Sequence, residues 1–326
     1  MKQINIYFIK PAIGSKWIPG DRRIVYFLKK IFKRQKTSGV EKVFFNLCKG
    51  FDELKVDYSV NVDFKKIKPG DPVIVLGAGR EGLKGYRQPN PIIAGIALMT
   101  HPSEWPSLCE DYPIVKYLQH SNWAQNVYVP YYGAEICDTW PAGIESDKWL
   151  PDENILKTFD VLVYNKIRWN KSQLDTELRL PVLEGLARRG LTYREIVYGS
   201  YKEDEYFELL RQARSMVFLC EHESQGLACC EALSMNVPVF AWDQGFCLDP
   251  NRFGWGDPIM PATSVPFFDD TCGMKFKGAT EFQSRFNVFW DRVQSGAYEP
   301  RKYILNNLTL KKSAERMLEI VRSVYK

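Results

Sequence analysis

The second half of the chain alternates apolar runs with helical segments, and this alternation restricts the possible folds more than any other feature. Strands are expected at 159–164, 193–198, 215–220 and 237–242, each separated from the next by a stretch with the composition of a helix. A strand–helix order repeated in this way predicts a parallel, doubly wound α/β sheet. Ligands of such sheets bind beyond the carboxyl ends of the strands, so the residues that follow these runs are candidates for a site.

The first half is also of the α/β type, although its alternation is less regular. Helices are expected at 41–51 and 122–131. Short apolar runs between turn residues predict the strands of a second sheet. These strands are expected at 4–8, 58–61, 73–76, 92–98 and 115–118.

Length and turn residues together predict two domains. A chain of 326 residues is long enough for two domains of ordinary size. The Trp-Pro-Ala-Gly turn that starts at Trp140 indicates the boundary between a domain at 1–150 and a second at 151–304. The tail, 305–326, contains an amphipathic helix.

Composition and charge exclude several classes of function. A net charge of +5, without zinc-finger spacing or an RNA-binding aromatic signature, is too small to indicate a nucleic-acid-binding protein. The eight cysteines are scattered without a C-x-x-C pair, so we expect reduced thiols and a cytoplasmic protein. The apolar stretch at the N-terminus is short and alternates with polar residues, which favours a first strand over a signal peptide.

Two glutamates flank a glycine where the third strand of the second half ends. Glu223 precedes Gly226, and Glu231 lies in the second turn of the helix that we expect to begin there. A helix N-terminus behind a glycine offers free N–H groups and a positive dipole end to an anion. Helical side chains lean toward the N-terminus, so Glu231 can reach a group beside that anion. A nucleoside diphosphate sugar fits this arrangement; the alternative is a surface helix with solvated glutamates.

This segment resembles the Glu-x7-Glu signature of the retaining GT-B glycosyltransferases of family 4. Ser224 stands where that family usually has glycine, and Pro141–Glu145 resembles its interdomain P-x-G-I-D segment. The resemblance implies two Rossmann-like domains that face a cleft and a terminal helix that crosses back onto the first domain. The matching positions are Glu223, Gly226, Leu227, Glu231, Ala232, Leu233, Pro238 and Val239.

The resemblance also implies how the donor is held by the helix that follows Gly226. Glu231 would bind the ribose hydroxyls, and Gly226 with Leu227 would bind the diphosphate. Glu223 would bind the hydroxyls of the transferred sugar. The turn Tyr198-Gly199 ends the preceding strand, where the fold places the nucleotide base, although a glycine at this place is also an ordinary turn.

Basic residues follow the first strand of the second half. Lys166 and Lys171 have the spacing of two basic residues in the family, the first of which is usually arginine. Two fixed cations would stabilise the departing diphosphate and replace a metal ion, in agreement with the lack of an Asp-x-Asp motif. Arg168 is a further candidate. The alternative is a solvated basic loop.

Residues of the first half are candidates for the acceptor side. Ser38-Gly39 resembles a glycine loop of the family that lies close to the sugar phosphate or the acceptor. Ser38 is equally suited to an ordinary helix cap. His101 follows a predicted strand at its carboxyl end, where a catalytic contact or a structural hydrogen bond would both be reasonable.

The function that these features favour is that of a retaining, metal-independent hexosyltransferase. The donor would be a UDP-sugar or a GDP-sugar, and the acceptor a hydroxyl of a glycan or of a lipid-linked compound. Two alternatives keep the fold. One is a sugar-nucleotide epimerase, for which three histidines give little support, and the other is a non-catalytic nucleotide-sugar-binding protein.

Two segments carry separate hypotheses. Residues 22–36 place seven basic residues around an apolar face and predict either peripheral contact with an anionic membrane or a solvated loop that steers an acceptor. Residues 247–276 are irregular and rich in glycine, proline and aromatic residues. They are expected to form either a loop that covers the donor or an inert insertion.

Overall fold

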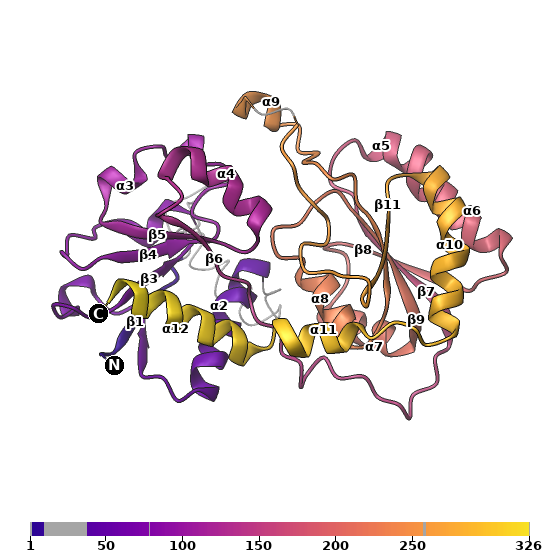
Figure 1. Ribbon diagram of the computed structural model, residues 1–326, viewed down its shortest axis with the longest axis horizontal. Helices are drawn as coiled ribbons and strands as arrows, with labels where there is room; N and C mark the ends of the chain where they lie inside the picture. Colours follow the sequence, from indigo (N-terminus) through magenta and orange to yellow (C-terminus); the bar gives the residue numbers. More distant parts are fainter. Residues whose placement is uncertain (1, 10–37, 78, 257–258, 326) are drawn as a thin grey trace, which may run out of the picture. The chain divides into compact units, whose positions relative to one another are not determined.

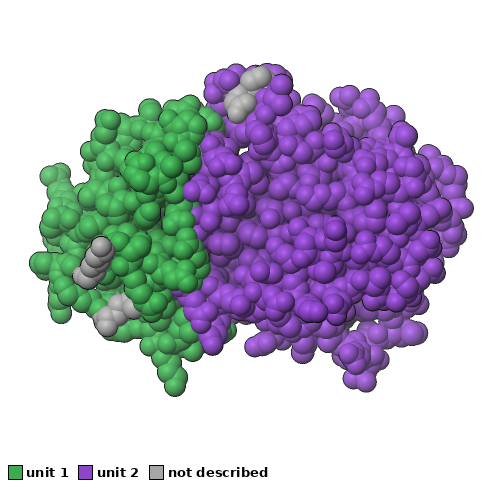
Figure 2. Space-filling model, in the orientation of Figure 1, with its two compact units in different colours: residues 1–118, 128–138, 316–326 green, residues 119–127, 139–315 purple. Residues whose placement is uncertain are grey.

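The computed structural model describes residues 2–9, 38–77, 79–256 and 259–325. The chain divides into two compact units (Figure 2). Unit 1 comprises 1–118, 128–138 and 316–326, and unit 2 comprises 119–127 and 139–315. The basic segment 22–36 lies outside the described residues. None of the described helices is long and apolar enough to span a lipid bilayer.

Unit 1 contains a six-stranded sheet with the order β2-β1-β3-β4-β5-β6. The pairings of β1 with β2 and β3, of β3 with β4 and of β4 with β5 are parallel, as predicted. The strands are β1 (Ile4–Tyr7), β2 (Tyr58–Val60), β3 (Val73–Leu76), β4 (Ile92–Gly95), β5 (Ile114–Gln119) and β6 (Cys137–Thr139). The α-helices along this part of the chain are α2 (Gly39–Glu53), α3 (Leu108–Asp111) and α4 (Asn122–Tyr132).

One predicted strand of unit 1 is too long. The expected strand at 92–98 ends at Gly95, because Ile96 and Ala97 have positive φ angles of 51° and 63°. A left-handed backbone cannot continue the ladder of a strand. The backbone N–H of Gly77 bonds to the carbonyls of Gly95 and Ile96, at 3.1 and 2.9 Å, and stabilises this turn.

Unit 2 contains a five-stranded parallel sheet with the order β11-β10-β9-β7-β8 (Figure 1). The pairings of β7 with β8 and β9, and of β10 with β9 and β11, are all parallel, which confirms the doubly wound prediction. The strands are β7 (Phe159–Lys166), β8 (Tyr193–Val197), β9 (Ala213–Cys220), β10 (Val239–Trp242) and β11 (Gly273–Phe276).

Helices cover both faces of the unit 2 sheet, as Figure 1 shows. Alternate residues of β7 point to opposite faces: Leu162 joins the core under α7, α8 and α11, and Val163 joins the core under α6 and α10. This burial on both sides explains why the strands read as almost continuous apolar runs. The α-helices along this part of the chain are α5 (Lys171–Leu174), α6 (Leu180–Arg188), α7 (Glu203–Gln212), α8 (Leu227–Ser234), α9 (Arg252–Trp255), α10 (Ala279–Gln294), α11 (Pro300–Asn307) and α12 (Leu310–Val324).

The C-terminal helix α12 begins among the residues of unit 2 and ends among those of unit 1. Its residue Arg316 forms an ion pair with Asp138 at 2.7 Å. Beyond its end, the hydroxyl of Tyr325 accepts a hydrogen bond from the backbone of Val73 at 3.0 Å and donates one to the carbonyl of Pro91. These contacts, all within unit 1, hold the end of the chain on that unit's sheet.

Candidate functional site

The order of the unit 2 sheet places its topological switch point between β7 and β9. Helices on opposite faces follow the two strands, so their carboxyl ends leave a crevice in which doubly wound folds bind ligands. The register pairs Lys166, the last residue of β7, with Cys220, the last residue of β9. The predicted residues that follow both strands therefore meet at this edge.

Lys166 and Glu223 form an ion pair at the switch point. Their side chains are only 14% and 13% exposed, and Lys166 Nζ also lies 4.3 Å from the ring centroid of Tyr198. Burial opposes ionisation of both groups and is the largest single influence on each. The charge of the partner and the hydrogen bond to it, together with other neighbours, act in the opposite direction, and the net result is a lowered pKa for Glu223 and a raised pKa for Lys166. Both groups are therefore charged at neutral pH, and three predicted residues are brought together.

The carboxylate of Glu221 links the loop that follows β9 to the loop that follows β7. Its carboxylate is almost fully buried, and Oε1 accepts hydrogen bonds from the backbone N–H groups of Arg168, at 2.7 Å, and Trp169, at 3.0 Å. The guanidinium of Arg168 donates to the carbonyl of His222 at 2.9 Å, and its Nε lies 3.8 Å from Glu221 Oε2. Arg168 thus binds the neighbouring loop. The role of Glu221 was not predicted. The signal that could have indicated it is a carboxylate directly after the apolar run that ends at Cys220.

His222 packs between two tryptophans beside the ion pair. Its ring stacks on Trp169, with centroids 5.2 Å apart, and meets Trp123 edge-on at 5.7 Å. Trp123 Nε1 also donates a hydrogen bond to the carbonyl of Glu223 at 2.9 Å. Burial, followed by the charge of Arg168, lowers the pKa of His222 to about 4. His222 is therefore neutral at pH 7 and orients the loops that carry Arg168 and Glu223.

Gly226 begins helix α8 in a left-handed conformation. Its φ of 71° and ψ of 47° are strained for a residue with a Cβ, so glycine is the suitable residue here. The turn directs the free N–H groups of α8 toward the carboxyl edge of the sheet. Leu227 is the first residue of the helix and packs partly against the core. The predicted helix start is confirmed.

Glu231 lies on α8, one turn inside the helix, and is only 4% exposed. Burial raises the pKa of Tyr201, and the charge of Glu231 raises it further. The hydroxyl of Tyr201 lies 2.5 Å from that of Tyr164 on β7, so the carboxylate of Glu231 acts on a tyrosine that is packed against the sheet.

Two predicted residues of the edge are more open. Lys171 is the first residue of the short helix α5; it is exposed and forms no ion pair with the described residues. Gly199 lies in the turn after β8, next to Tyr198, whose backbone N–H bonds to the carbonyl of Asn165 at 2.8 Å. Tyr198 itself is half exposed. These residues leave polar and aromatic groups accessible to a ligand.

The segment expected to be irregular contributes to the site and also contains a strand that was not predicted. Thr263 accepts the backbone N–H of Glu223 at 3.0 Å through its carbonyl. Its hydroxyl bonds to Asp243 at 2.6 Å, and Lys275 of β11 forms an ion pair with the same carboxylate at 2.8 Å. The loop before β11 is therefore fixed beside Glu223.

The predicted acceptor residues belong to unit 1. Ser38 caps α2: its hydroxyl accepts from the N–H of Glu41, and Glu41 accepts from the N–H of Ser38, each at 3.3 Å. Gly39 is exposed at the start of the helix. His101 is buried, contacts Ser103 through Nδ1 at 2.8 Å and meets the ring of Tyr131 edge-on. The cap role of Ser38 is present, while an acceptor role for these residues stays a prediction.

Comparison with known proteins identifies the fold. No family model matches the chain, and no curated protein matches it significantly in sequence. Among solved structures, the lipopolysaccharide outer core galactosyltransferase WaaB is 12% identical over 98% of this chain and 100% of its own, with a TM-score of 0.55. HepE of Anabaena, solved with UDP, is 10% identical over 98% and 100%, with a TM-score of 0.56.

A third match is longer than this chain. The pneumococcal O-GlcNAc transferase GtfA, solved with UDP and GlcNAc, is 11% identical over 80% of this chain, with a TM-score of 0.53. The aligned part is only 58% of GtfA. The matches have in common two parallel-sheet α/β domains. This chain has the fold of the GT-B glycosyltransferases.

Proposed function

We propose that this chain transfers a hexose from a nucleoside diphosphate sugar to a hydroxyl of a glycan or of a lipid-linked acceptor. The observation that carries the proposal is the Lys166–Glu223 ion pair at the switch point of unit 2, next to the N-terminus of α8. A diphosphate needs cations and backbone N–H groups, and a sugar needs a carboxylate that accepts from its hydroxyls. Both kinds of group lie side by side here.

Each residue has a role in this reaction. The N–H groups of α8 bind the diphosphate, and Lys166 and Lys171 stabilise the negative charge that grows on it as the bond to the sugar breaks. Glu223 accepts from sugar hydroxyls, and Glu231 accepts from ribose hydroxyls. In this proposal the acceptor oxygen bonds to the anomeric carbon while the departing diphosphate takes its proton on the same face. Configuration is then retained without a metal ion.

The division of roles between the two glutamates can be measured. We expect Glu231→Gln to weaken binding of the bare nucleoside diphosphate, whereas Glu223→Gln should spare it and damage sugar transfer. Isothermal titration with UDP and GDP tests the first part, and UDP comes first because GtfA and HepE were solved with it. Equal losses of nucleotide affinity in both variants would refute the assignment.

The reaction itself needs a direct assay. Incubation with UDP-sugars and GDP-sugars should release free nucleotide when a suitable acceptor is present, and chelation of divalent metals should not lower the rate. Release of an epimerised donor would favour an epimerase, and binding without turnover would favour a binding protein. Activity that a chelator abolishes and magnesium restores would exclude the metal-free mechanism. Lys171→Gln should lower turnover strongly, because it removes a positive charge that would stabilise the leaving diphosphate.

A further inference from the structure

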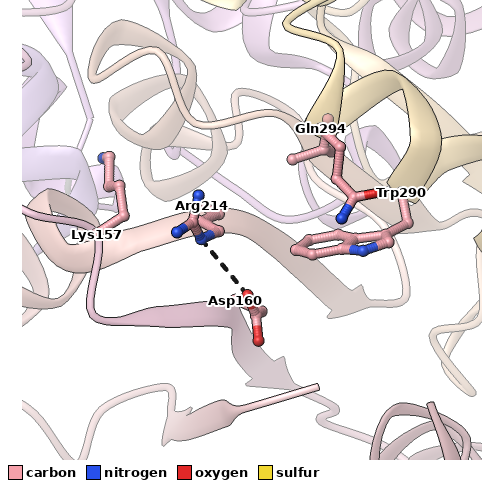
Figure 3. Close-up of a pocket in the computed structure, with 6 residues that line it drawn as sticks. Lys157, Asp160, Arg214, Trp290 and Gln294 are labelled. Atoms are coloured by element: carbon pink, nitrogen blue, oxygen red, sulfur yellow. Dashed lines mark ion pairs between the residues drawn. The ribbon is translucent and has the colours of Figure 1, made fainter. Parts of the chain in front are cut away.

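A cavity of unit 2 lies at the opposite edge of the sheet from Lys166. It has a volume of about 440 Å³ and sits where β7 and β9 begin, beside the last turns of α10 (Figure 3). Asp160 at its base and Lys166 are six residues apart on one strand, so the two sites are separated by roughly 20 Å. The lining side chains are Lys157, Asp160, Arg214, Trp290, Val293 and Gln294.

The cavity has more positive charge than the protein itself neutralises. The Oδ2 atom of Asp160 already accepts from the N–H of Thr192, at 2.9 Å, and from its hydroxyl, at 2.8 Å. Only Oδ1 is near Arg214, whose Nε lies 3.5 Å away, as Figure 3 marks. Among the described residues, no carboxylate pairs with Lys157. Two cations therefore share one carboxylate that is largely engaged elsewhere.

The position of Lys157 supports this view of the charge. Within the described part of the chain, its ammonium donates a single hydrogen bond, a long one of 3.5 Å, to the carbonyl of Leu210. Burial lowers the pKa of Lys157, and the nearby charge of Arg214 lowers it further. An anion placed between Lys157 and Arg214 would relieve the repulsion between them.

The other wall of the cavity is a flat indole with polar groups around it. Trp290 is partly exposed, and its ring is parallel to that of Phe286, 6.3 Å away. Figure 3 shows the amide of Gln294 next to the indole and Arg214 on the other side of the cavity. No described residue accepts a hydrogen bond from the indole N–H. The wall thus offers one apolar ring surface together with unused donors.

We propose that this cavity binds a pyranose sugar that carries an anionic group, either a carboxylate or a phosphate. The C–H face of the sugar ring stacks on Trp290, the anionic group lies between Arg214 and Lys157, and ring hydroxyls bond to Gln294. Four of the six lining side chains are polar, which suits a hydroxylated ring better than an aromatic one. The site is separate from the proposed donor site and does not depend on it.

The proposal is tested by direct binding, which is independent of any transfer activity. Glucuronate and glucose 6-phosphate serve as probes, because they carry the two kinds of anion on the same ring. Glucose and inorganic phosphate are the controls, each with only half of the recognised chemistry. Isothermal titration and the indole N–H signals in ¹⁵N spectra report the binding. At least one anionic sugar should bind about tenfold more tightly than both controls.

Variants assign the binding to this cavity. Arg214→Gln and Trp290→Phe should each weaken binding by about tenfold, since one removes a charged donor and the other reduces the stacking surface. Lys302→Gln, an exposed cation of α11 in the same unit, should leave it unchanged. Thermal unfolding of each variant shows that the fold is kept. The proposal is overturned if neither anionic sugar binds, if glucose or phosphate binds equally well, or if the Arg214 variant binds as the wild type does.

Discussion

Residues of the unit 2 site are held by partners that are distant in sequence, whereas Ser38 of unit 1 is held by a near neighbour. Glu221 bonds to the backbone of Arg168, 53 positions away, while Ser38 and Glu41 cap each other at a spacing of three. The first arrangement exists only when the whole unit is folded, and the second forms with a single helix. The effects of substitutions in the two regions should therefore differ in magnitude and in how much of the structure they disturb.

The largest effect is expected for the ion pair. Glu223→Gln leaves the charge of Lys166 largely buried without its partner, which should lower the free energy of unfolding by about 3 kcal/mol. Replacing both residues, as Lys166→Met with Glu223→Leu, should recover most of this loss. Urea unfolding of the two variants measures it.

A matched pair on the surface provides the control. Glu184 and Arg188 form an exposed ion pair on α6, 3.6 Å apart. Glu184→Gln should change the free energy of unfolding by less than about 1 kcal/mol. If it costs as much as Glu223→Gln, burial of the Lys166 charge is not the cause of the larger effect.

The second largest effect is expected for substitution of Glu221. Glu221→Ala leaves two backbone N–H groups of the neighbouring loop without an acceptor, at a cost of about 1–3 kcal/mol. The same change should weaken nucleotide binding, because that loop connects Lys166 at the end of β7 to Lys171 at the start of α5. Glu221→Gln keeps an acceptor oxygen and should restore most of both properties. Lost stability with unchanged nucleotide affinity in the alanine variant would contradict the positioning role.

The third effect depends on pH. Burial in the folded chain lowers the pKa of His222 from its ordinary value of 6.5 to about 4, so the unfolded state binds more protons between these values. The contribution of His222 to the free energy of unfolding is therefore complete above pH 6.5 and decreases as the pH falls toward 4. His222→Gln should flatten the dependence between about pH 7 and 5, by on the order of 1 kcal/mol.

His120 supplies the comparison for that measurement. Burial also lowers the pKa of His120 to about 4, so His120→Gln should remove a similar part of the slope. Urea unfolding at several pH values measures both variants. An unchanged slope in the His222 variant would show that this ring is not kept neutral by its surroundings.

The smallest effect is expected in unit 1. Ser38→Ala removes the cap of α2 and should cost about 1 kcal/mol, while Ser38→Asp should keep the cap. Nucleotide affinity should not change in either variant. Transfer activity that is lost in both variants at unchanged stability would assign Ser38 to the acceptor side and not only to the cap.

The sheet of unit 2 was predictable because its strands are buried on both faces and read as apolar runs. The switch-point edge was predictable for the same reason, since Lys166 and Glu223 lie within three residues of the ends of such runs. Glu221 was not, because a sequence does not distinguish a buried carboxylate from a solvated one until its partner, the loop of Arg168, is placed by the fold. That partner is distant in sequence.

Strand β11 was not predicted, for a different reason. Its four residues, Gly273–Phe276, are too few to show a period, and Lys275 interrupts the apolar pattern. A Cβ at Gly273 would collide with the carbonyl of Val239 on the neighbouring strand. Glycine is needed at this position because the backbone of β10 lies so close. The sequence pattern of the segment itself carries no information about that neighbouring strand. The helices α10 and α11 that follow were also not predicted.

The Lys166–Glu223 pair has a consequence for which compounds can occupy the proposed donor site. A bare phosphate that takes Lys166 leaves a buried carboxylate without its cation, and a neutral sugar that takes Glu223 cannot replace the charge that Lys166 loses. A compound with both a phosphate and hydroxyls at the right spacing compensates the two losses together. If the proposed function holds, a nucleoside diphosphate sugar should therefore bind in preference to inorganic phosphate.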